Sequence, residues 1–261
     1  MRLFLLNLFA DAPEPCAPSD VVRLSTGDNL IPLYRHVDGG DPASWSFAHV
    51  ARLRLKVQRH LAARRPDSML VKTHAALMPM AGEPPFAMDV AGGAICVVRN
   101  PLDIAPSYAR HLGATVDATV AVMAEAGYTL PRTAELAEFI QGSWSQNVAS
   151  WTARPNPLVH VMRYEDMVAD PRTTFARVRD FLKLDPSPER LDRAIRHSAL
   201  DTLMRLEDER GFIERVAGQK RFFGEGGVDV WKEALTEAQA RRIVAQHRVQ
   251  MARFGYVPEG W

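Results

Sequence analysis

The sequence predicts an α/β fold in which helices cover both faces of a parallel sheet. Three short apolar runs, at residues 68–73, 94–98 and 158–162, have the length of buried strands. Segments with helical spacing of apolar residues separate them, and strands that alternate with helices form parallel sheets that bind ligands at their carboxyl ends. The 261 residues, 47% of them hydrophobic, suit a single domain that spans residues 1–261.

The segment before the first strand is predicted to contain two helices joined by an irregular stretch. Residues 3–10 are apolar; a secretory signal is an alternative, but the interruption at Asn7 and a poor cleavage region favour an amphipathic or buried helix. Residues 12–46 contain several prolines and are predicted to form an irregular surface or lid. A helix over residues 46–65 should pack on the sheet, because apolar residues recur there at helical spacing.

The remaining elements follow from caps, apolar spacing and glycines. Thr236 is a candidate N-cap for the last helix, and Glu237 lies in its first turn. A loop rich in Pro, Gly and Met follows the first strand, and a loop with five glycines precedes the last helix. The predicted loops cover 74–92 and 211–231, and the predicted helices cover 101–112, 117–126, 133–153, 171–184, two segments within 188–207, and 236–254.

The most informative segment joins the second predicted strand to the helix after it. Asn100 is a candidate N-cap and Asp103 favours the positive end of the helix, so Arg99 lies at the carboxyl edge of the sheet, facing a helix N-terminus. A guanidinium there can bind two oxygens of a dianion, and a hydroxyl such as Ser107 can add a third contact. On spacing alone, an ordinary strand–helix joint with a solvated arginine is the alternative.

Composition narrows the function classes. A net charge of +1 argues against a broad surface for nucleic acid or membrane. Cys16 and Cys96 are too few for a disulfide framework, so a reducing cytoplasm is the simplest setting. The eight histidines are scattered without ligand spacing, so no metal site is predicted, and no apolar run reaches membrane-spanning length.

Four segments, in order along the chain, resemble motifs of sulfotransferases that use 3′-phosphoadenosine 5′-phosphosulfate (PAPS), of the bacterial cytosolic type. The run Val-Val-Arg-Asn-Pro-Leu-Asp-Ile-Ala-x-Ser at 97–107 resembles their 3′-phosphate-binding motif. Residues 70–74 resemble their strand-then-histidine segment, 163–171 their Tyr-Glu-Asp box, and 222–231 their glycine-rich C-terminal loop. The resemblance implies a three-layer, P-loop-like parallel sheet flanked by helices.

The family resemblance also implies an activity: transfer of a sulfuryl group from PAPS to a hydroxyl or amine of a small-molecule acceptor. His74 leaves a strand at the presumed ligand edge and has an ordinary pKa near working pH, so it is the candidate general base, as the resemblance also implies. Lys72 would add positive charge near the sulfuryl group. A structural or solvated histidine and a solvated edge lysine are the alternatives.

The resemblance assigns cofactor contacts that would also hold the product, adenosine 3′,5′-bisphosphate. Pro106 is expected to remove one helical hydrogen bond and kink the helix beside Ser107. Tyr164 would contact adenine, or simply pack at a strand end, whereas Glu165 and Asp166 start a helix and Trp231 anchors the loop to the core. The family commonly has an arginine or lysine just before the glycine at Gly226, and Arg221 or Lys220 would take its place here. The predicted cofactor-binding residues are Arg99, Ser107, Tyr164, Ser198, Arg221, Gly226 and Gly227.

One part of the family pattern is absent from the sequence. These enzymes open with a strand and a phosphosulfate loop resembling Tyr-Pro-Lys-Ser-Gly-x-Thr-Trp, and residues 1–9 instead resemble the helix that follows that loop. We expect the native protein to be longer by roughly 15 to 20 residues, which sequencing of the upstream DNA would test. Without the loop we expect negligible transfer.

Two other function classes stay open at this point. The first is a non-catalytic nucleotide-binding or scaffold relative of sulfotransferases, suggested by the absent loop. The second is another nucleotide-dependent transferase, although no Walker lysine or magnesium-ligand pattern supports a kinase. The sequence does not identify the acceptor, because the acceptor pocket is expected to lie among variable loops at 12–46, 75–92 and 113–133. It does not indicate the oligomeric state either.

Overall fold

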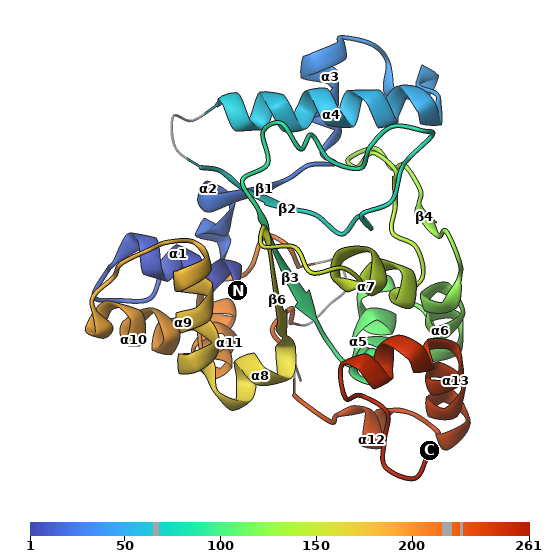
Figure 1. Cartoon of the computed structure of the whole chain (residues 1–261). Helices are drawn as coiled ribbons and strands as arrows, with labels where there is room; N and C mark the ends of the chain where they lie inside the picture. Colours follow the sequence, from blue (N-terminus) through green and yellow to red (C-terminus); the bar gives the residue numbers. More distant parts are fainter. Residues whose placement is uncertain (65–67, 216–220, 225–226) are drawn as a thin grey trace. The chain divides into compact units, whose positions relative to one another are not determined.

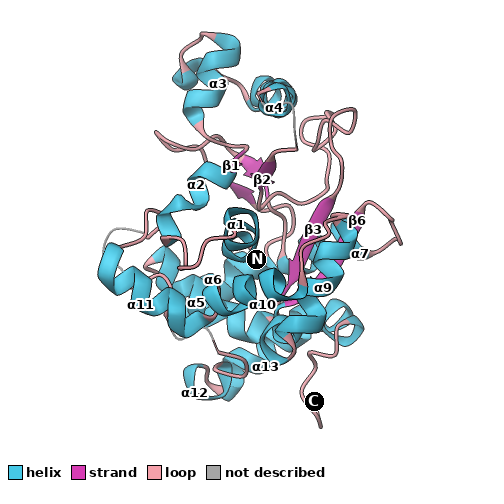
Figure 2. Ribbon diagram, turned by 90° about the vertical axis from the view of Figure 1, so that its left-hand side faces the viewer, coloured by secondary structure: helices cyan, strands magenta, loops and turns pink. Residues whose placement is uncertain are grey.

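The computed structural model describes residues 1–64, 68–215, 221–224 and 227–261. Contacts divide the chain into two compact units that mix helices with short strands (Figures 1 and 2). We call these the first and second units, and each is described by itself; a single domain over the whole chain stays a prediction. The first unit comprises Met1–Leu24, Val97–Val120 and His160–Trp261, and the second comprises Ser25–Cys96 and Ala121–Val159.

Most elements fall within one unit. The first unit holds α1 (Arg2–Ala10), η1 (Pro18–Asp20), α2 (Val21–Leu24), α5 (Pro101–Leu112), α8 (Tyr164–Ala169), α9 (Pro171–Phe181), α10 (Pro188–His197), α11 (Leu200–Arg210), α12 (Trp231–Ala234) and α13 (Glu237–Arg253). The second holds β1 (Ser25–Gly27), α3 (Ile31–Asp38), η2 (Pro42–Ser44), α4 (Phe47–Ala63), β2 (Leu70–Lys72), β4 (Thr129–Leu130), β5 (Phe139–Ile140) and α7 (Trp144–Thr152). The division falls within β3 (Ala94–Val98), α6 (Val116–Ala124) and β6 (Val159–Arg163).

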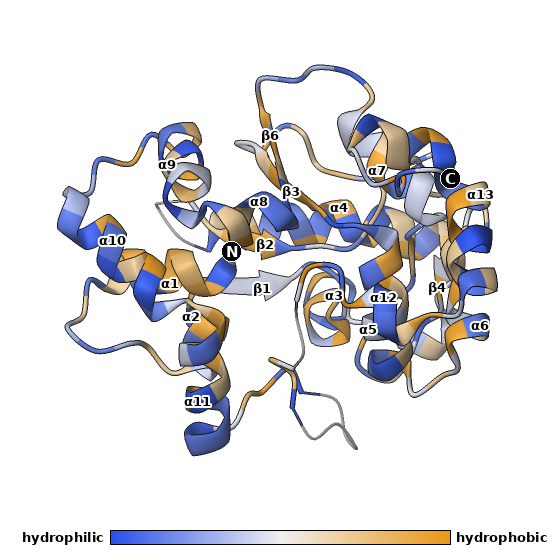
Figure 3. Cartoon of the chain, turned by 90° about the horizontal axis from the view of Figure 1, so that it is seen from below, coloured by the Kyte–Doolittle hydropathy of each residue, from blue (hydrophilic) through white to orange (hydrophobic). Residues whose placement is uncertain are grey.

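Helix α1 is buried on nearly every side, which confirms a helix over residues 3–10. In Figure 3 it is coloured mostly for hydrophobic residues, and it packs against α10. Phe4 stacks on Phe175 of α9 with ring centroids 3.9 Å apart. Its one polar residue within the buried run, Asn7, donates to the carbonyl oxygen of Leu3 at 2.9 Å and accepts from the backbone N–H of Cys16 at 2.9 Å. Both of its side-chain functions are therefore satisfied inside the core.

The core of the second unit lies around α3 and α4, which pack side by side (Figure 1). Ser46 caps α4 by accepting from the backbone N–H of His49 at 3.2 Å. The apolar residues Val50, Leu53, Val57 and Leu61 recur at helical spacing and are fully buried, whereas Phe47 at the start of the helix is exposed. The buried cluster consists of Ile31, Tyr34, Trp45, Val50, Ala51, Leu53, Val57, Leu61, Met80 and Ala137.

The described strands form three two-stranded sheets. Strands β1 and β2 pair in parallel, with Ser25 opposite Leu70 and Gly27 opposite Lys72. Strands β3 and β6 pair with each other, and β4 and β5 pair in the antiparallel sense. All three predicted strands are present, as β2, β3 and β6.

The prediction that residues 12–46 are irregular is wrong. This stretch contains η1, α2, β1, α3 and η2. Its prolines suggest an irregular stretch, but Pro18, Pro32 and Pro42 each lie in the first turn of a short helix. A proline there breaks no helical hydrogen bond, because the N–H groups of the first turn have no partner within the helix. The parallel pairing of β1 with β2 was not foreseen either, since the strand Ser-Thr-Gly carries no apolar pattern.

The prediction of one helix over residues 133–153 is also wrong. Residues 139–140 form β5, and the helix α7 begins only after Ser143, which forms a capping box with Gln146. Gly142 precedes this cap with a φ of 68°, a left-handed conformation that ends the strand and favours glycine.

The helices predicted in the rest of the chain are present, with small shifts of their ends. The pair expected within 188–207 corresponds to α10 and α11, and Thr236 caps α13 through a capping box with Gln239. In the described part of the chain, no helix combines the length and apolarity that crossing a membrane requires.

Candidate cofactor and catalytic sites

The joint between β3 and α5 has the geometry that the sequence predicts. The side chain of Asn100 accepts from the backbone N–H of Leu102 at 3.1 Å and so caps α5, and Pro101 occupies the first helical position. Arg99 is the one residue between the end of β3 and this cap. The local sequence alone dictates this geometry, because an apolar strand, a cap and a proline succeed one another without a spacer.

Arg99 contacts two other predicted cofactor residues. Its guanidinium carbon lies 4.4 Å from the ring centroid of Tyr164, a cation–π distance, and its Nη2 donates to the carbonyl oxygen of Gly227 at 3.0 Å. The Nε of Arg99 is buried and makes no hydrogen bond to any described residue. The structure therefore brings together Arg99, Tyr164 and Gly227, which come from three distant parts of the sequence.

The carboxylate of Glu165, predicted from the sequence only to start a helix, holds this joint in place. Glu165, in the first turn of α8, accepts from the backbone N–H of Asn100 at 2.9 Å and from the hydroxyl of Tyr256 at 2.6 Å. The same hydroxyl lies 3.3 Å from the carbonyl oxygen of Val98. Burial raises the pKa of Tyr256, so the phenol keeps its proton and acts as a donor. These hydrogen bonds hold the end of β3 and the start of α8 in a fixed relative position.

The carboxylate of Asp103 holds the segment after Gly227. Its two oxygens accept from the backbone N–H groups of Asp229 and Trp231, each at 3.0 Å. Burial raises the pKa of Asp103, while these two hydrogen bonds and the charge of Arg99 lower it. Trp231 is predicted from the sequence to anchor this loop. Its ring lies beside that of Trp261, with ring centroids 6.2 Å apart, but the anchoring hydrogen bond comes from its backbone N–H.

Three of the predicted cofactor residues are not brought into contact with Arg99 by any described interaction. Ser107 is half-buried on α5, which runs through Pro106 to Leu112 as one helix. Ser198 lies at the end of α10, where its hydroxyl donates to the carbonyl oxygen of Ala194 at 2.8 Å. Arg221 pairs with Asp208, with an Nε–Oδ1 distance of 2.8 Å. Gly226 and Lys220, also singled out from the sequence, lie outside the described residues.

The segment that contains Arg221 is fixed by a buried carboxylate on α11. Glu207, 2% exposed, accepts from the backbone N–H groups of Phe222 and Phe223 at 2.7 and 2.8 Å. The rings of these two phenylalanines pack against Phe212. Glu207 thus holds the start of the C-terminal loop as Asp103 holds its end.

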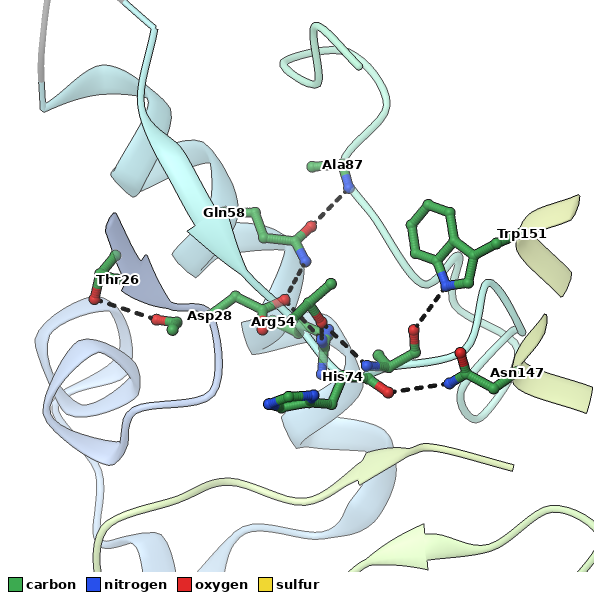
Figure 4. A network of polar contacts seen from close by, with 11 residues as sticks. Thr26, Asp28, Arg54, Gln58, His74, Ala87, Asn147 and Trp151 are labelled. Atoms are coloured by element: carbon green, nitrogen blue, oxygen red, sulfur yellow. Dashed lines mark hydrogen bonds and ion pairs between the residues drawn. The ribbon is translucent and has the colours of Figure 1, made fainter. Parts of the chain in front are cut away.

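The candidate base His74 and the candidate Lys72 belong to the second unit. Lys72 ends β2, and His74 follows two residues later with an exposed side chain. The carbonyl oxygen of His74 accepts from the side-chain amide of Asn147 on α7 at 3.1 Å. In Figure 4 the imidazole of His74 points away from Asn147, so the backbone is held on one side while the ring extends on the other.

Hydrogen bonds continue along the three residues after His74. The carbonyl oxygen of Ala75 accepts from the indole N–H of Trp151 at 3.1 Å, as Figure 4 shows. The backbone N–H of Ala76 donates to the carbonyl oxygen of Ile140 at 2.9 Å, and that of Leu77 donates to the hydroxyl of Ser150 at 2.9 Å. A segment bonded at every residue has little backbone freedom, so it can present an imidazole in one orientation.

Several of these roles could not be read from the sequence. Asp103, Glu165 and Glu207 are acidic residues in helices, a pattern that normally marks a solvated helix surface. Their hydrogen-bond partners lie 15 to 128 positions away in the chain. The one available signal is that Asp103 and Glu165 lie within two of the four segments that resemble sulfotransferase motifs, at 97–107 and 163–171. Among the described residues, no three His, Cys, Asp or Glu side chains gather closely enough to hold a metal ion.

The comparison with family models supports the resemblance seen in the sequence. A model described as "Sulfotransferase domain" matches residues 20–255, which include all four motif segments. An amine sulfotransferase of Oryctolagus cuniculus is 25% identical over 202 residues, or 73% of this chain and 64% of that protein. Sulfotransferase 1E1 of Mus musculus is 28% identical over 171 residues, or 60% of this chain and 54% of that protein. The chain thus spans less than two thirds of the length of these relatives.

Solved structures show the same fold. Mouse sulfotransferase SULT7A1, complexed with PAP, aligns over 95% of this chain and 78% of its own, with a TM-score of 0.60 and 17% identity. Retinol dehydratase, in complex with androsterone and the inactive cofactor PAP, aligns over 96% and 85%, with a TM-score of 0.58 and 18% identity. The predicted P-loop-like α/β fold is confirmed. Since the family model matches nearly the whole chain, this protein belongs to the sulfotransferase domain family.

Proposed function

We propose that this protein transfers a sulfuryl group from PAPS to a hydroxyl or amine of a small-molecule acceptor. The observation that carries the proposal is Arg99, which lies at the β3–α5 joint, against the ring of Tyr164 and beside the backbone of Gly227. Family membership supports sulfuryl transfer in general, and the solved relatives named above are complexes with PAP. The names of the curated relatives refer to amines and hydroxysteroids, which supports a small acceptor.

The residues of the first unit suit a nucleotide that carries phosphate. Arg99 has a buried Nε without a hydrogen-bond partner among the described residues, so it retains a donor for an anionic oxygen. The ring of Tyr164 is half-buried and already packs face-on to a cation, and burial raises its pKa, so it stays neutral and can pack against a base. We assign Arg99 and Ser107 to the 3′-phosphate, Tyr164 and Ser198 to the adenine end, and Arg221, Gly226 and Gly227 to the remaining phosphate contacts.

In the second unit we assign the proton transfer to His74. PAPS, when bound, supplies an activated sulfuryl group and a bisphosphate leaving group. The imidazole of His74 takes the proton of the acceptor hydroxyl or amine as the acceptor atom bonds to sulfur, and Lys72 stabilises the negative charge that builds on the departing phosphate. The hydrogen bonds along residues 74–77 support this role, because a base must be held in one orientation to contribute fully.

The proposal extends to setting and partners. Both cysteines are free thiols, which fits a reducing cytoplasm. No metal is needed for the roles assigned here, because His74 handles the proton and cationic side chains handle the phosphate. We propose a small-molecule acceptor as the principal partner, with neither nucleic acid nor membrane required.

Two measurements test this function. Isothermal titration with adenosine 3′,5′-bisphosphate should show binding that Arg99→Ala weakens at least about tenfold, because a charge-assisted hydrogen bond is lost. Arg110→Ala, an exposed arginine on the same helix, is the matched control and should bind normally. The transfer assay uses the protein with the phosphosulfate loop if the upstream DNA encodes one. Its incubation with ³⁵S-labelled PAPS and a panel of amines and hydroxysteroids should yield labelled product that His74→Ala abolishes while bisphosphate binding is retained.

The outcomes separate the candidate functions. Bisphosphate binding without label transfer to any acceptor would indicate a non-catalytic nucleotide-binding relative. Binding that Arg99→Ala leaves unchanged would remove Arg99 from the cofactor site. Unchanged transfer by His74→Ala would exclude His74 as the base.

A further inference from the structure

We infer that Arg54 is a positioning residue for His74, and that it acts through the hydroxyl of Thr73. Arg54 lies on α4, and its side chain is 3% exposed. No motif considered in the sequence includes it. The inference rests on the proposed role of His74 as general base, and it names a residue that sets the geometry of that base without touching the reacting atoms.

One nitrogen of Arg54 joins the ends of two paired strands. Its Nη2 donates to Oδ2 of Asp28 at 2.6 Å (Figure 4), and it also donates to the hydroxyl oxygen of Thr73 at 3.2 Å. Asp28 and Thr73 are the first residues after β1 and β2, whose last paired positions are Gly27 and Lys72. Arg54 therefore links the two strands at the point where the hydrogen bonds between them end.

The cross-link brackets His74. The hydroxyl oxygen of Thr73 accepts from Arg54 on one side and from the backbone N–H of Ala75 at 3.2 Å on the other, so it spans the residue between them. The amide of Asn147 holds the carbonyl oxygen of His74 itself. With residues 73, 74 and 75 each fixed by a side chain, the direction in which the His74 ring leaves the backbone is determined by this network.

The surroundings of Arg54 indicate that it positions Thr73 more than it stabilises the fold. Its Nε and Nη1 are buried and make no hydrogen bond with any described residue, although its guanidinium lies 5.7 Å from the ring of Phe86 and 5.6 Å from that of Phe139. A buried ion pair is a weak source of stability compared with apolar packing, because both charges lose their hydration. What the ion pair supplies, and apolar packing cannot, is a directed donor at Thr73.

A second polar side chain keeps Asp28 in place. The amide of Gln58 donates to Oδ2 of Asp28 at 3.0 Å and accepts from the backbone N–H of Ala87 at 2.8 Å. Asp28 is thus held by two donors from α4, one turn apart, and it holds Arg54 in the rotamer that reaches Thr73. Gln58 and Arg54 thus both bind Asp28, and Arg54 in turn donates to the hydroxyl of Thr73, the residue before His74.

Substitution of Thr73 tests the inference while leaving the Asp28–Arg54 ion pair intact. Thr73→Val has nearly the same shape but no hydroxyl, and Thr73→Ser keeps the hydroxyl and is the matched control. The first readout is the ¹H–¹⁵N spectrum of the histidine rings, in which the His74 signals are identified by their loss in His74→Gln. We expect one sharp set of His74 signals, with the same titration midpoint, in the unsubstituted protein and Thr73→Ser, and broadened or doubled signals in Thr73→Val.

The second readout is sulfuryl transfer. Thr73→Val should lower kcat about tenfold to a hundredfold, while the KM for PAPS changes less than about twofold, because misplacing a base impairs the chemical step and not cofactor binding. Thr73→Ser should restore kcat. Arg54→Lys, which keeps the charge beside Asp28 but cannot span both partners, should reproduce the Thr73→Val effects and serves in its place if Thr73→Val does not fold.

The two proposals can fail separately. If His74→Ala transfers normally, the role of His74 fails, and the ring spectra of the Thr73 variants still decide whether Arg54 and Thr73 orient that ring. Unchanged His74 signals and unchanged kcat in both Thr73→Val and Arg54→Lys would overturn the inference about Arg54.

Discussion

The carboxylate of Asp103, in the first turn of α5, accepts a 3.0 Å hydrogen bond from the backbone N–H of Trp231. The same side chain accepts from the N–H of Asp229. The helix that begins beside Arg99 therefore also holds the segment that follows Gly227, the residue whose carbonyl Arg99 binds. Two parts of the chain that contact the candidate cofactor residue are fastened to each other by one buried carboxylate.

Asp103→Asn should destabilise this connection. An amide keeps the shape of the side chain but presents an N–H₂ group to one of the two backbone N–H donors, so one charge-assisted hydrogen bond is lost and a part-buried donor is left unpaired. We expect the free energy of unfolding, measured by urea titration, to fall by about 1–3 kcal/mol. Adenosine 3′,5′-bisphosphate should also bind more weakly in isothermal titration.

The matched control for this substitution is Asp117→Asn. Asp117 also lies in the first turn of a helix but is exposed, so its change should stay within about 0.5 kcal/mol. Equal stability of Asp103→Asn and Asp117→Asn would contradict an anchoring role for Asp103.

Glu207→Gln should loosen the start of the C-terminal loop. Glu207 is 2% exposed and accepts from the backbone N–H of Phe222 with one carboxylate oxygen and from that of Phe223 with the other. Glutamine replaces one of these oxygens with an N–H₂ group, which cannot accept. Amide hydrogen exchange at Phe222 and Phe223 should accelerate, and the free energy of unfolding should fall by about 1–3 kcal/mol. Glu209→Gln, which removes only a surface ion pair with Arg205, should leave both quantities nearly unchanged. Unchanged exchange at the two phenylalanines would show that Glu207 does not hold the loop.

Tyr256→Phe removes the hydroxyl that donates to Glu165 at 2.6 Å. Because Glu165 also accepts from the backbone N–H of Asn100, the loss should reach the β3–α5 joint and not only the C-terminal segment. We expect about 1.5–3 kcal/mol less stability, the range for a hydrogen bond to a charged group, together with weaker bisphosphate binding. Tyr128→Phe, in the second unit, is the control. A stability loss without any change in binding would mean that the joint does not depend on this hydrogen bond.

We expect the buried imidazole of His247 to make the free energy of unfolding depend on pH. This histidine of α13 is 2% exposed, and burial lowers its pKa from 6.5 to about 4. Between these values the unfolded chain binds the proton and the folded chain does not, so stability is highest above pH 6.5 and falls as the pH drops toward 4. At pH 5 the lost stability from this one group amounts to about 2 kcal/mol.

Comparison with His247→Leu isolates this contribution. Between pH 7 and pH 5, the unsubstituted protein should lose about 2 kcal/mol more of its free energy of unfolding than His247→Leu, measured by urea titration at each pH. His111→Gln, at an exposed position, should keep the pH slope of the unsubstituted protein. A slope that His247→Leu does not alter would mean that the buried imidazole titrates normally.

The accuracy of the sequence-based predictions depended on how local the signal was. The strand before Arg99, the cap at Asn100 and the helix after it were all predicted correctly, because each depends on residues a few positions apart. The predictions for residues 12–46 and 133–153 were wrong. Prolines are compatible with a loop or with the first turn of a helix, and apolar residues with a helix or a strand, so the strand pairing and the caps seen in the structure are needed to decide between them.

The site divides in the same way. The sequence alone determined the sulfotransferase family and the position of Arg99 between strand and helix, since both reside in contiguous motifs. Only the tertiary structure decided which groups surround those residues: Gly227 lies 128 positions from Arg99, Glu165 lies 65 positions from Asn100, and Arg54 reaches both Asp28 and Thr73. The physical reason is that a buried donor or acceptor must find a partner, but the chain carries no periodic pattern that says which distant group it will be.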